Sequence, residues 1–294
     1  MSESNRVNLA LGGLKASLSL HGGAILSCTW RGIPILRTAP EGCGPGDRAC
    51  FPLLPFGNRI TGNGFRFEGR SFSLTPNTPH DPHYLHGEGW QSDWQMTKNT
   101  PDTVEMRHAC VGSTIPYAYQ ATQSISVAEE DLSLTLSVTN VGPLRMPFGI
   151  GFHPYFPLTR NTVLQFLAGP MMDELPGHLS GPPVPTPADM DFRTGAPLPG
   201  RWINNAFENW DGDAWIKWLD RGIAVHVQAD AVFRVAQLYA PGSTEGPSTD
   251  ADYFAFEPMS HLPNGHNLED LGGLVPLAKG ETLTASLVLR PQVL

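Results

Sequence analysis

The sequence lacks the features that mark several common classes of protein. Only 16% of its residues are charged, the net charge is −9, and no block of lysine and arginine occurs, so we expect no nucleic-acid partner. The longest apolar runs fall far short of the roughly 18 residues that a membrane-spanning helix needs, so we expect no membrane partner. The first residues show no basic start followed by an apolar core, as a signal peptide would. We therefore expect a cytoplasmic protein.

Cysteine is scarce, and the common catalytic motifs are missing. The sequence contains no GxSxG, GxxxxGK[ST] or HExxH motif. The glycines around Gly62 do not open a predicted helix, so a dinucleotide fingerprint is unsupported. No CxxC spacing occurs, which favours buried thiols over disulfides or a zinc site. The four cysteines are Cys28, Cys43, Cys50 and Cys110.

Helical periodicity is also missing, since no stretch of about 12 or more residues repeats apolar side chains at helical spacing. The chain holds 31 glycines and 28 prolines, roughly a fifth of its residues against about 12% in typical globular proteins. Both are poor helix formers. Apolar and polar residues alternate instead, as in strands with one buried face, over residues 132–138, 223–227 and 283–289. Turns at residues 220–222 and 68–70 predict two β-hairpins, so the sequence predicts an all-β fold.

Residues 170–200 differ from the rest of the chain, because they hold eight prolines and few alternating apolar residues. A linker between two domains is one interpretation. However, similar alternating segments lie on both sides, and neither half has a distinct composition. We therefore predict a single antiparallel β-sandwich domain over residues 1–294, with an irregular, proline-rich surface loop at 170–200.

Two polar clusters interrupt the apolar pattern in the first third of the chain. Asn58 and Arg59 stand beside several glycines, which let the backbone turn sharply or approach a ligand. The alternative is an arginine on a surface turn. The second cluster holds His80, His83 and His86, whose spacing suggests a metal site. Histidine ligands usually converge from more than one element, so a single buried histidine with a polar role is favoured and no metal is expected.

Two further polar residues stand in apolar surroundings later in the chain. His153 lies in a run that is otherwise apolar or glycine, and Glu257 follows a strand-like aromatic run. A buried imidazole must be hydrogen-bonded, and in a dry cleft it can act as a general acid or base. Glu257 is either a partner for an arginine or a base whose pKa is raised by desolvation. Such groups suit proton transfer on a neutral polar substrate.

Five short motifs follow one another along the chain: Asn58-Arg59-Ile60, residues 64–69, Leu85-His86-Gly87, residues 151–156 and Phe256-Glu257-Pro258. In this order they resemble the aldose 1-epimerase (galactose mutarotase) family, and the match spans roughly residues 20–290. The resemblance implies a large antiparallel β-sandwich, the galactose mutarotase-like supersandwich.

The resemblance also implies an activity, the interconversion of the α and β anomers of a free aldose, a hexose such as galactose or glucose. In the family, the residue matched by Glu257 takes the proton from the C1 hydroxyl. The residue matched by His153 protonates the ring oxygen, and the sugar opens to an aldehyde that recloses from the other face. This chemistry needs no cofactor. The sugar-binding residues implied by position are Asn58, Arg59, His86 and Tyr155.

One position departs from the family pattern. Family members carry a sugar-binding aspartate where this chain has Asn204, which keeps an acceptor but adds two donors and removes a charge. Either Asn204 binds the sugar, or Asp211 or Asp213 takes over the role. The alternative functions are a hexose-6-phosphate 1-epimerase, a non-catalytic carbohydrate-binding protein and a metal-dependent enzyme that uses the histidines of residues 80–86.

Overall fold

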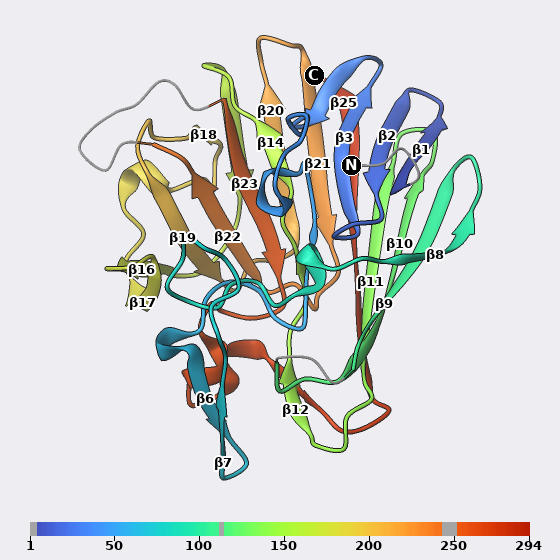
Figure 1. The fold of residues 1–294 in the computed structure, drawn as a ribbon. Coiled ribbons are helices and arrows are strands. Elements are labelled where there is room, and N and C mark those ends of the chain that lie inside the picture. Colours follow the sequence, from blue (N-terminus) through green and yellow to red (C-terminus); the bar gives the residue numbers. More distant parts are fainter. Residues whose placement is uncertain (1–4, 112–114, 243–251) are drawn as a thin grey trace.

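The computed structural model describes residues 5–111, 115–242 and 252–294, and it is built mainly from antiparallel strands (Figure 1). The helical segments in these ranges are 3-10 turns of three residues. The larger of two main sheets has nine strands in the order β18-β15-β20-β21-β25-β11-β10-β9-β8. Their bounds are β8 (Gln95–Asn99), β9 (Thr103–Cys110), β10 (Tyr119–Val127), β11 (Leu132–Asn140), β15 (Thr162–Phe166), β18 (Ala196–Pro197), β20 (Asp213–Trp218), β21 (Ile223–Ala229) and β25 (Thr282–Val293).

The second main sheet has eight strands and carries most of the residues discussed below. Its order is β17-β16-β19-β22-β23-β13-β5, and β14 also pairs with β23. The bounds are β5 (Pro52–Leu53), β13 (Gly151–Phe152), β14 (Tyr155–Pro157), β16 (Met171–Leu175), β17 (Leu179–Val184), β19 (Ile203–Glu208), β22 (Val235–Ala240) and β23 (Tyr253–Met259).

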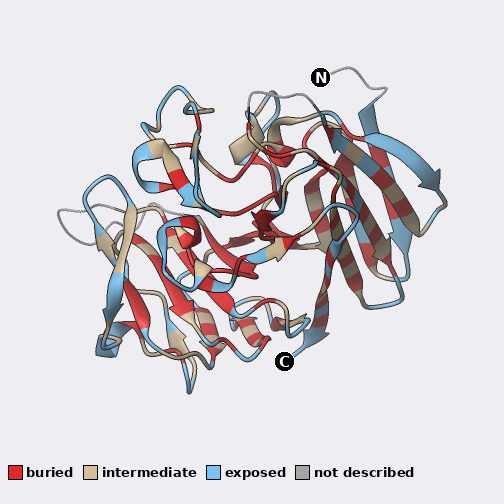
Figure 2. Cartoon of the chain, turned by 90° about the horizontal axis from the view of Figure 1, so that it is seen from below, coloured by how far each residue is buried: buried red, intermediate tan, exposed pale blue. Residues whose placement is uncertain are grey.

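The two main sheets pack against each other through aromatic side chains. The ring of Phe166 on β15 lies 5.1 Å from those of Phe207 on β19 and Phe256 on β23, measured between centroids. These rings belong to one large apolar cluster that includes residues of both sheets. The strands carry alternating bands of buried and less buried residues (Figure 2). The predicted antiparallel β-sandwich is therefore confirmed.

Several local predictions are confirmed as well. The alternating residues 132–138 form most of β11, where Leu132, Leu134, Leu136 and Val138 are buried. The turn at 220–222 joins β20 to β21, and the turn at 68–70 joins β6 (Gly64–Phe67) to β7 (Arg70–Ser73). Smaller sheets complete the fold: β1 (Arg6–Leu11), β2 (Leu14–Ser19), β3 (Ala24–Trp30) and β4 (Ile33–Leu36), and the pair β12 (Met146–Phe148) and β24 (Val275–Leu277).

The prediction of an irregular loop at 170–200 is wrong for much of that segment. β16 and β17 form a hairpin that extends the eight-stranded sheet, and β18 pairs with β15 in the other sheet. Both β17 and β18 are edge strands. An edge strand tolerates proline because one side of it needs no backbone N–H donor, so Pro183 can pair opposite Met172. Proline content alone was therefore a poor indicator of irregular structure here.

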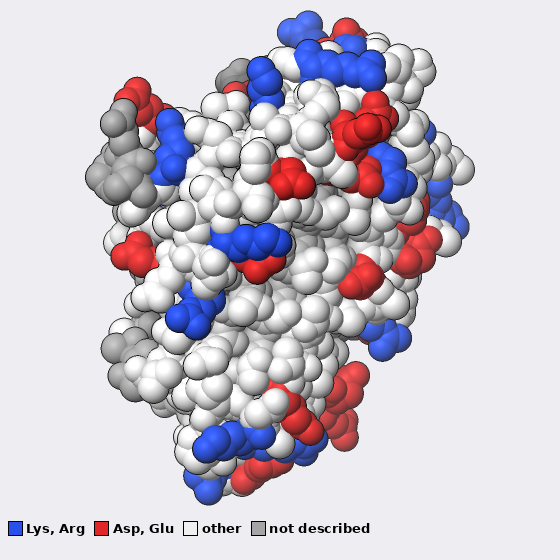
Figure 3. All heavy atoms as spheres, turned by 90° about the vertical axis from the view of Figure 1, so that its right-hand side faces the viewer, with Lys and Arg blue, Asp and Glu red and all other residues white. Residues whose placement is uncertain are grey.

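The surface charges of one face and the positions of the cysteines can be compared with the expectations from the sequence. On the face drawn in Figure 3, lysine and arginine lie among aspartate and glutamate, and no extended area carries one sign. Cys28, Cys50 and Cys110 are buried, and burial raises the pKa of the Cys28 thiol to about 12. Within the described ranges, no helix is long and apolar enough to cross a membrane.

Candidate active site

The alternation of β23 places Glu257 on the face of the eight-stranded sheet that points away from the aromatic core. Phe254 and Phe256 belong to the large apolar cluster between the sheets, whereas Ala255 and Met259 belong to a second, smaller cluster on the other face. Since side chains of a strand alternate between faces, Glu257 lies with the second cluster. It is only 2% exposed. A carboxyl group at such a site is expensive to keep ionised, which marks it as a candidate functional group.

His153 faces Glu257 from the short connection between β13 and β14, two strands that both pair with β23. The backbone N–H of His153 donates to the carbonyl of Phe51 at 2.9 Å, and the imidazole stacks on the Phe51 ring with 4.6 Å between centroids. Tyr155 packs on the imidazole at the same centroid distance. These contacts hold the Nε2 atom of His153 at 3.2 Å from Oε1 of Glu257. The structure therefore brings the two predicted catalytic residues into direct contact.

Burial moves the pKa of each member of this pair toward its neutral form. It lowers the pKa of His153 to about 3 and raises that of Glu257 well above its ordinary value. The nearby Arg59 guanidinium acts in the opposite direction on the Glu257 pKa. Within the described part of the chain, Nδ1 of His153 and Oε2 of Glu257 have no hydrogen-bond partner. The pair can therefore share one proton and still has polar atoms available to a ligand.

His86 stands edge-on to His153, with 5.3 Å between ring centroids. The backbone N–H of Asn58 donates to Nδ1 of His86 at 3.0 Å, so the neutral ring carries its hydrogen on Nε2. Burial lowers the pKa of His86 well below its usual range, and the His153 and Arg59 charges lower it further. The next residue, Gly87, has a φ of +67°, and a Cβ there would lie 2.1 Å from the Leu54 carbonyl oxygen. Glycine is thus needed for this loop to hold His86 in place.

Asn58 and Arg59 also lie at this site. Asn58 adopts a φ of 60°, a left-handed conformation that asparagine tolerates, and its Oδ1 accepts from the Arg59 backbone N–H at 2.8 Å. The Arg59 side chain binds the carboxylate of Asp81, with both Nε and Nη2 at 2.7 Å from Oδ2. Its Nη1 donates to the carbonyl of His178 at 3.4 Å. The Arg59 side chain is therefore ion-paired and only 16% exposed, unlike an arginine that extends into solvent from a surface turn.

The histidines of residues 80–86 do not share one role: His86 contacts His153, whereas the backbone N–H of His83 donates to Asp81. Asp81, which the sequence did not single out, binds Arg59, and its Oδ1 accepts from the His83 backbone N–H. Among the residues that the structure describes, no three histidine, cysteine, aspartate or glutamate side chains are grouped to hold a metal ion. The metal-dependent alternative therefore has no ligand set in those residues.

Asn204 on β19 is joined to two polar residues that sequence reasoning missed. Its Nδ2 donates to Oε1 of Glu174 at 3.0 Å, and its Oδ1 accepts from Nε2 of Gln237 at 2.9 Å. Gln237 on β22 lies directly opposite Glu257 in the strand register. A glutamine within an apolar strand was the available sequence signal, whereas Glu174 was hidden in the segment interpreted as a loop. Asp213 instead lies on β20 in the other main sheet and binds His226, so it does not replace Asn204.

Aromatic rings line part of the same region. The Tyr155 ring lies edge-on to that of Tyr253, and the Arg37 guanidinium lies 4.0 Å above the Tyr253 centroid. Trp202 donates its indole N–H to Glu174. Trp210, by contrast, belongs to the large apolar cluster and not to this region.

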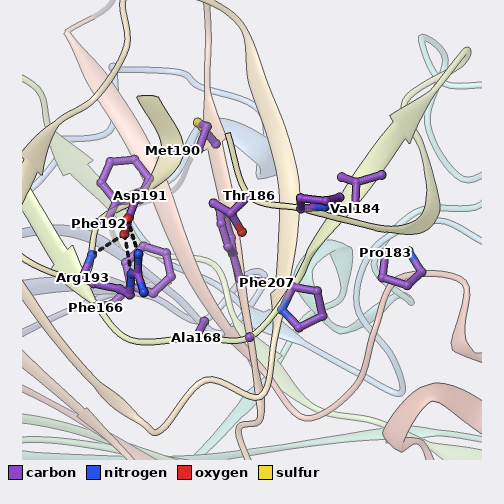
Figure 4. Close-up of a pocket in the computed structure, with 13 residues that line it drawn as sticks. Phe166, Ala168, Pro183, Val184, Thr186, Met190, Asp191, Phe192, Arg193 and Phe207 are labelled. Carbon is purple, nitrogen blue, oxygen red and sulfur yellow. Dashed lines mark hydrogen bonds and ion pairs between the residues drawn. The ribbon is translucent and has the colours of Figure 1, made fainter. Parts of the chain in front are cut away.

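A separate cavity of about 600 Å³ lies beneath residues 183–193 (Figure 4). Its lining is mainly apolar and includes Phe166, Phe192 and Phe207. The two charged residues of the lining, Asp191 and Arg193, bind each other at 2.6 Å. None of the predicted site residues lines this cavity, so it is distinct from the candidate site.

Comparison with known proteins finds matches over nearly the whole chain. The family model described as aldose 1-epimerase matches residues 6–290. YphB, an uncharacterised protein of Escherichia coli K12, is 36% identical over 284 residues, which are 96% of this chain and 97% of YphB.

Solved structures give the same result for the fold. An Escherichia coli K12 structure with a provisional assignment as an aldose 1-epimerase superposes with a TM-score of 0.92 and 36% identity, covering 98% of this chain and 99% of that one. A galactose mutarotase-like protein of Clostridium acetobutylicum superposes with a TM-score of 0.85 at 18% identity, covering 98% and 95%, which shows a shared fold alone. The predicted galactose mutarotase-like fold is confirmed. Since the family model covers nearly the whole chain, the chain belongs to the aldose 1-epimerase family.

Proposed function

We propose that this protein is a mutarotase that interconverts the α and β anomers of a free aldose, a hexose such as galactose or glucose. The observation that carries the proposal is the contact between His153 Nε2 and Glu257 Oε1, 3.2 Å apart and buried. Anomerisation moves a proton between two oxygens that are both bonded to C1. The acid and the base must therefore approach each other closely, as these two side chains do.

The chemistry follows from the single proton that the pair shares. Ring opening starts with Glu257 ionised and His153 protonated: the carboxylate takes the C1 hydroxyl proton, the C1–ring oxygen bond breaks, and the imidazolium protonates the ring oxygen. This leaves a protonated Glu257 and a neutral His153, the state that burial favours. Rotation about the C1–C2 bond and the reverse transfers close the ring from the other face. The pair returns to its starting state, so no cofactor is required.

The other predicted residues supply binding groups around this pair. His86 offers its Nε2–H to the ring oxygen, since its Nδ1 accepts from the Asn58 backbone. Arg59, held by Asp81, offers its remaining guanidinium hydrogens to sugar hydroxyls. The free oxygens of Gln237 and Glu257 can accept from hydroxyls, because Oε1 of Gln237 and Oε2 of Glu257 have no partner within the described residues.

Two further residues are proposed to contact the sugar. Tyr155, packed on the His153 ring, is proposed to form a wall of the sugar-binding site. Asn204 is proposed to bind hydroxyls, although part of its hydrogen-bonding capacity is already used by Glu174 and Gln237.

A phosphorylated hexose is the second candidate substrate, and one residue favours it. Arg37 lies over Tyr253, 5.5 Å from the Tyr155 ring centroid, and has no carboxylate partner in the described ranges. A guanidinium in this position could bind a phosphate. Against this, the Glu174 carboxylate, which binds Asn204, lies in the same region and disfavours an anion.

A panel of substrates tests the proposal. Freshly dissolved α-D-galactose and α-D-glucose, followed by polarimetry, should reach anomeric equilibrium faster with the protein than in buffer. The acceleration over the spontaneous rate should be larger for these sugars than for the corresponding 6-phosphates. If the phosphates are preferred, the substrate class is wrong. If calorimetry shows sugar binding while polarimetry shows no acceleration, the protein is a carbohydrate-binding protein and the proposed catalysis is refuted.

A further inference from the structure

A row of hydrogen-bonded side chains crosses the eight-stranded sheet from its outer hairpin to β22, the strand beside the one that carries Glu257. It begins at Glu174 on β16, continues through Asn204 on β19 and ends at Gln237 on β22, with donor–acceptor distances of 3.0 and 2.9 Å. Gln237 is 2% exposed and lies opposite Glu257 in register, so both side chains point to the same face. The row therefore runs from the outer hairpin of the sheet to the residue that lies opposite the proposed catalytic carboxyl group in the strand register.

The direction of every hydrogen bond in this row is set at Glu174. An ionised carboxylate only accepts hydrogen bonds, so it requires the amide nitrogen of Asn204 to point toward it. The Oδ1 of Asn204 must then face Gln237 and accept from its Nε2. As a result Gln237 keeps its amide nitrogen on the Asn204 side and leaves Oε1, which has no partner among the described residues, as a fixed acceptor.

Glu174 also holds the hairpin tip that contacts Arg59. Its carboxylate accepts from the Trp202 indole N–H at 2.9 Å and lies 2.8 Å from Nδ1 of His178. The carbonyl of His178 in turn accepts from Nη1 of Arg59 and from Nδ2 of Asn204, at 3.4 and 3.5 Å. A register shift between Met172 and Glu174 in the β16–β17 pairing accompanies this arrangement. Bulges of this kind often re-aim a side chain.

We propose that Glu174 is a positioning residue for sugar binding, which fixes the orientation of the Asn204 and Gln237 amides and, through His178, the placement of Arg59. This inference rests on the proposed function and adds a determinant of affinity outside the acid–base pair. Glu174 acts through its neighbours, so its loss should weaken sugar binding and leave proton transfer nearly intact. In kinetic terms, KM should rise while kcat changes little.

Moving the carboxylate from position 174 to position 204 provides a direct test, because the hydrogen-bond donors and acceptors of each variant can be counted. In Glu174→Gln, the amide nitrogen faces a donor in either orientation: the Trp202 indole N–H if it replaces Oε2, or the Asn204 amide N–H if it replaces Oε1. We therefore expect the Kd for D-galactose to rise roughly tenfold, as for one lost charge-assisted hydrogen bond. In Asn204→Asp, two carboxylates face each other, which should raise the Kd at least as much.

The double variant Glu174→Gln/Asn204→Asp should recover most of the affinity. The introduced glutamine would then accept from Trp202 with its oxygen and donate to the introduced aspartate, which still accepts from Gln237. We expect the Kd of the double variant to return to within about threefold of the wild-type value. Glu208→Gln, at the far end of β19, is the matched control and should leave the Kd unchanged.

Two measurements keep this proposal separate from the proposed activity. Calorimetric titration with D-galactose reports the Kd whether or not the protein accelerates anomerisation, and polarimetry reports kcat independently. A wild-type Kd for Glu174→Gln would overturn the proposal, as would a double variant that binds no better than the weaker single variant. Thermal unfolding of each variant identifies a loss of folding, and the recovery in the double variant then decides the outcome.

Discussion

The His153–Glu257 pair consists of two groups that burial drives toward their neutral forms. Such a pair can hold one proton on either partner, which suits a reaction that starts and ends with the same protonation. The residues around it differ in kind: Arg59 and Asp81 form a charged pair, whereas His86 is held by a neutral backbone donor. Roles in binding and in proton transfer can therefore be separated by mutation.

Asp81→Asn tests the binding role of Arg59. The change removes the charge that holds the guanidinium through Nε and Nη2, so the Arg59 side chain should lose its fixed position. We expect KM for the aldose to rise about tenfold while kcat changes little. Steady-state polarimetry at several sugar concentrations measures both constants. A large loss of kcat with unchanged KM would show that Arg59 takes part in the chemical step instead.

At this scale the sequence identified the residues with unusual surroundings but not the partners that orient them. His153 and Glu257 each interrupt an apolar run, and the structure brings these two side chains into contact. Asp81 and Glu174 gave no comparable signal, and Gln237 was missed although it interrupts an apolar strand, because the importance of a polar residue depends on which strands become neighbours. Strand neighbours far apart in sequence cannot be read from local periodicity.

Strand β23 is the element that organises the site. Its alternation sends Phe256 into the core and Glu257 to the opposite face, while β13 and β14 on one side bring His153 and β22 on the other brings Gln237. The alternation of strands was predictable from the sequence, and so were two hairpins. The β16–β17 hairpin was not, because its prolines resemble those of a loop although they occupy an edge strand.

Gly151→Ala tests the importance of the close approach between β13 and β23. A Cβ at this position would lie 2.8 Å from the Pro258 carbonyl oxygen and 3.1 Å from Cγ of Met259. The added methyl group should push β13 away and separate His153 from Glu257. We expect kcat to fall about tenfold or more and Tm to decrease, as for other overpacked positions.

A control for this variant is Gly44→Ala, where a Cβ would meet its nearest neighbouring atom at 3.7 Å. Activity by polarimetry and Tm by calorimetry should match the wild-type values there. If Gly151→Ala behaves like this control, the tight contact between the two strands has no part in positioning the catalytic pair.

For the molecule as a whole, buried histidines predict a stability that depends on pH. Burial lowers the pKa of His153 to about 3 and that of His261 to about 4, and it lowers those of His86 and His266 well below 6.5. Below about pH 6.5 these histidines bind protons in the unfolded chain but stay neutral in the folded chain. The free energy of unfolding must therefore fall as the pH drops. The raised pKa of Glu257 opposes this above pH 4.5, but it is one group against four.

Calorimetric unfolding between pH 7 and pH 5 measures this effect. Tm should decrease steadily as the solution becomes more acidic. A Tm that stays constant or increases over this range would mean that the four imidazoles are not held neutral in the folded protein.

The central claim is that Glu257 and His153 perform the proton transfers, and their substitution tests it most directly. Glu257→Gln and His153→Ala should each slow the anomerisation of fresh α-D-galactose by about 100-fold or more relative to wild type, after subtraction of the spontaneous rate, with the circular dichroism spectrum unchanged. If polarimetry shows that both folded variants are as active as wild type, this pair is not the acid and the base of the reaction.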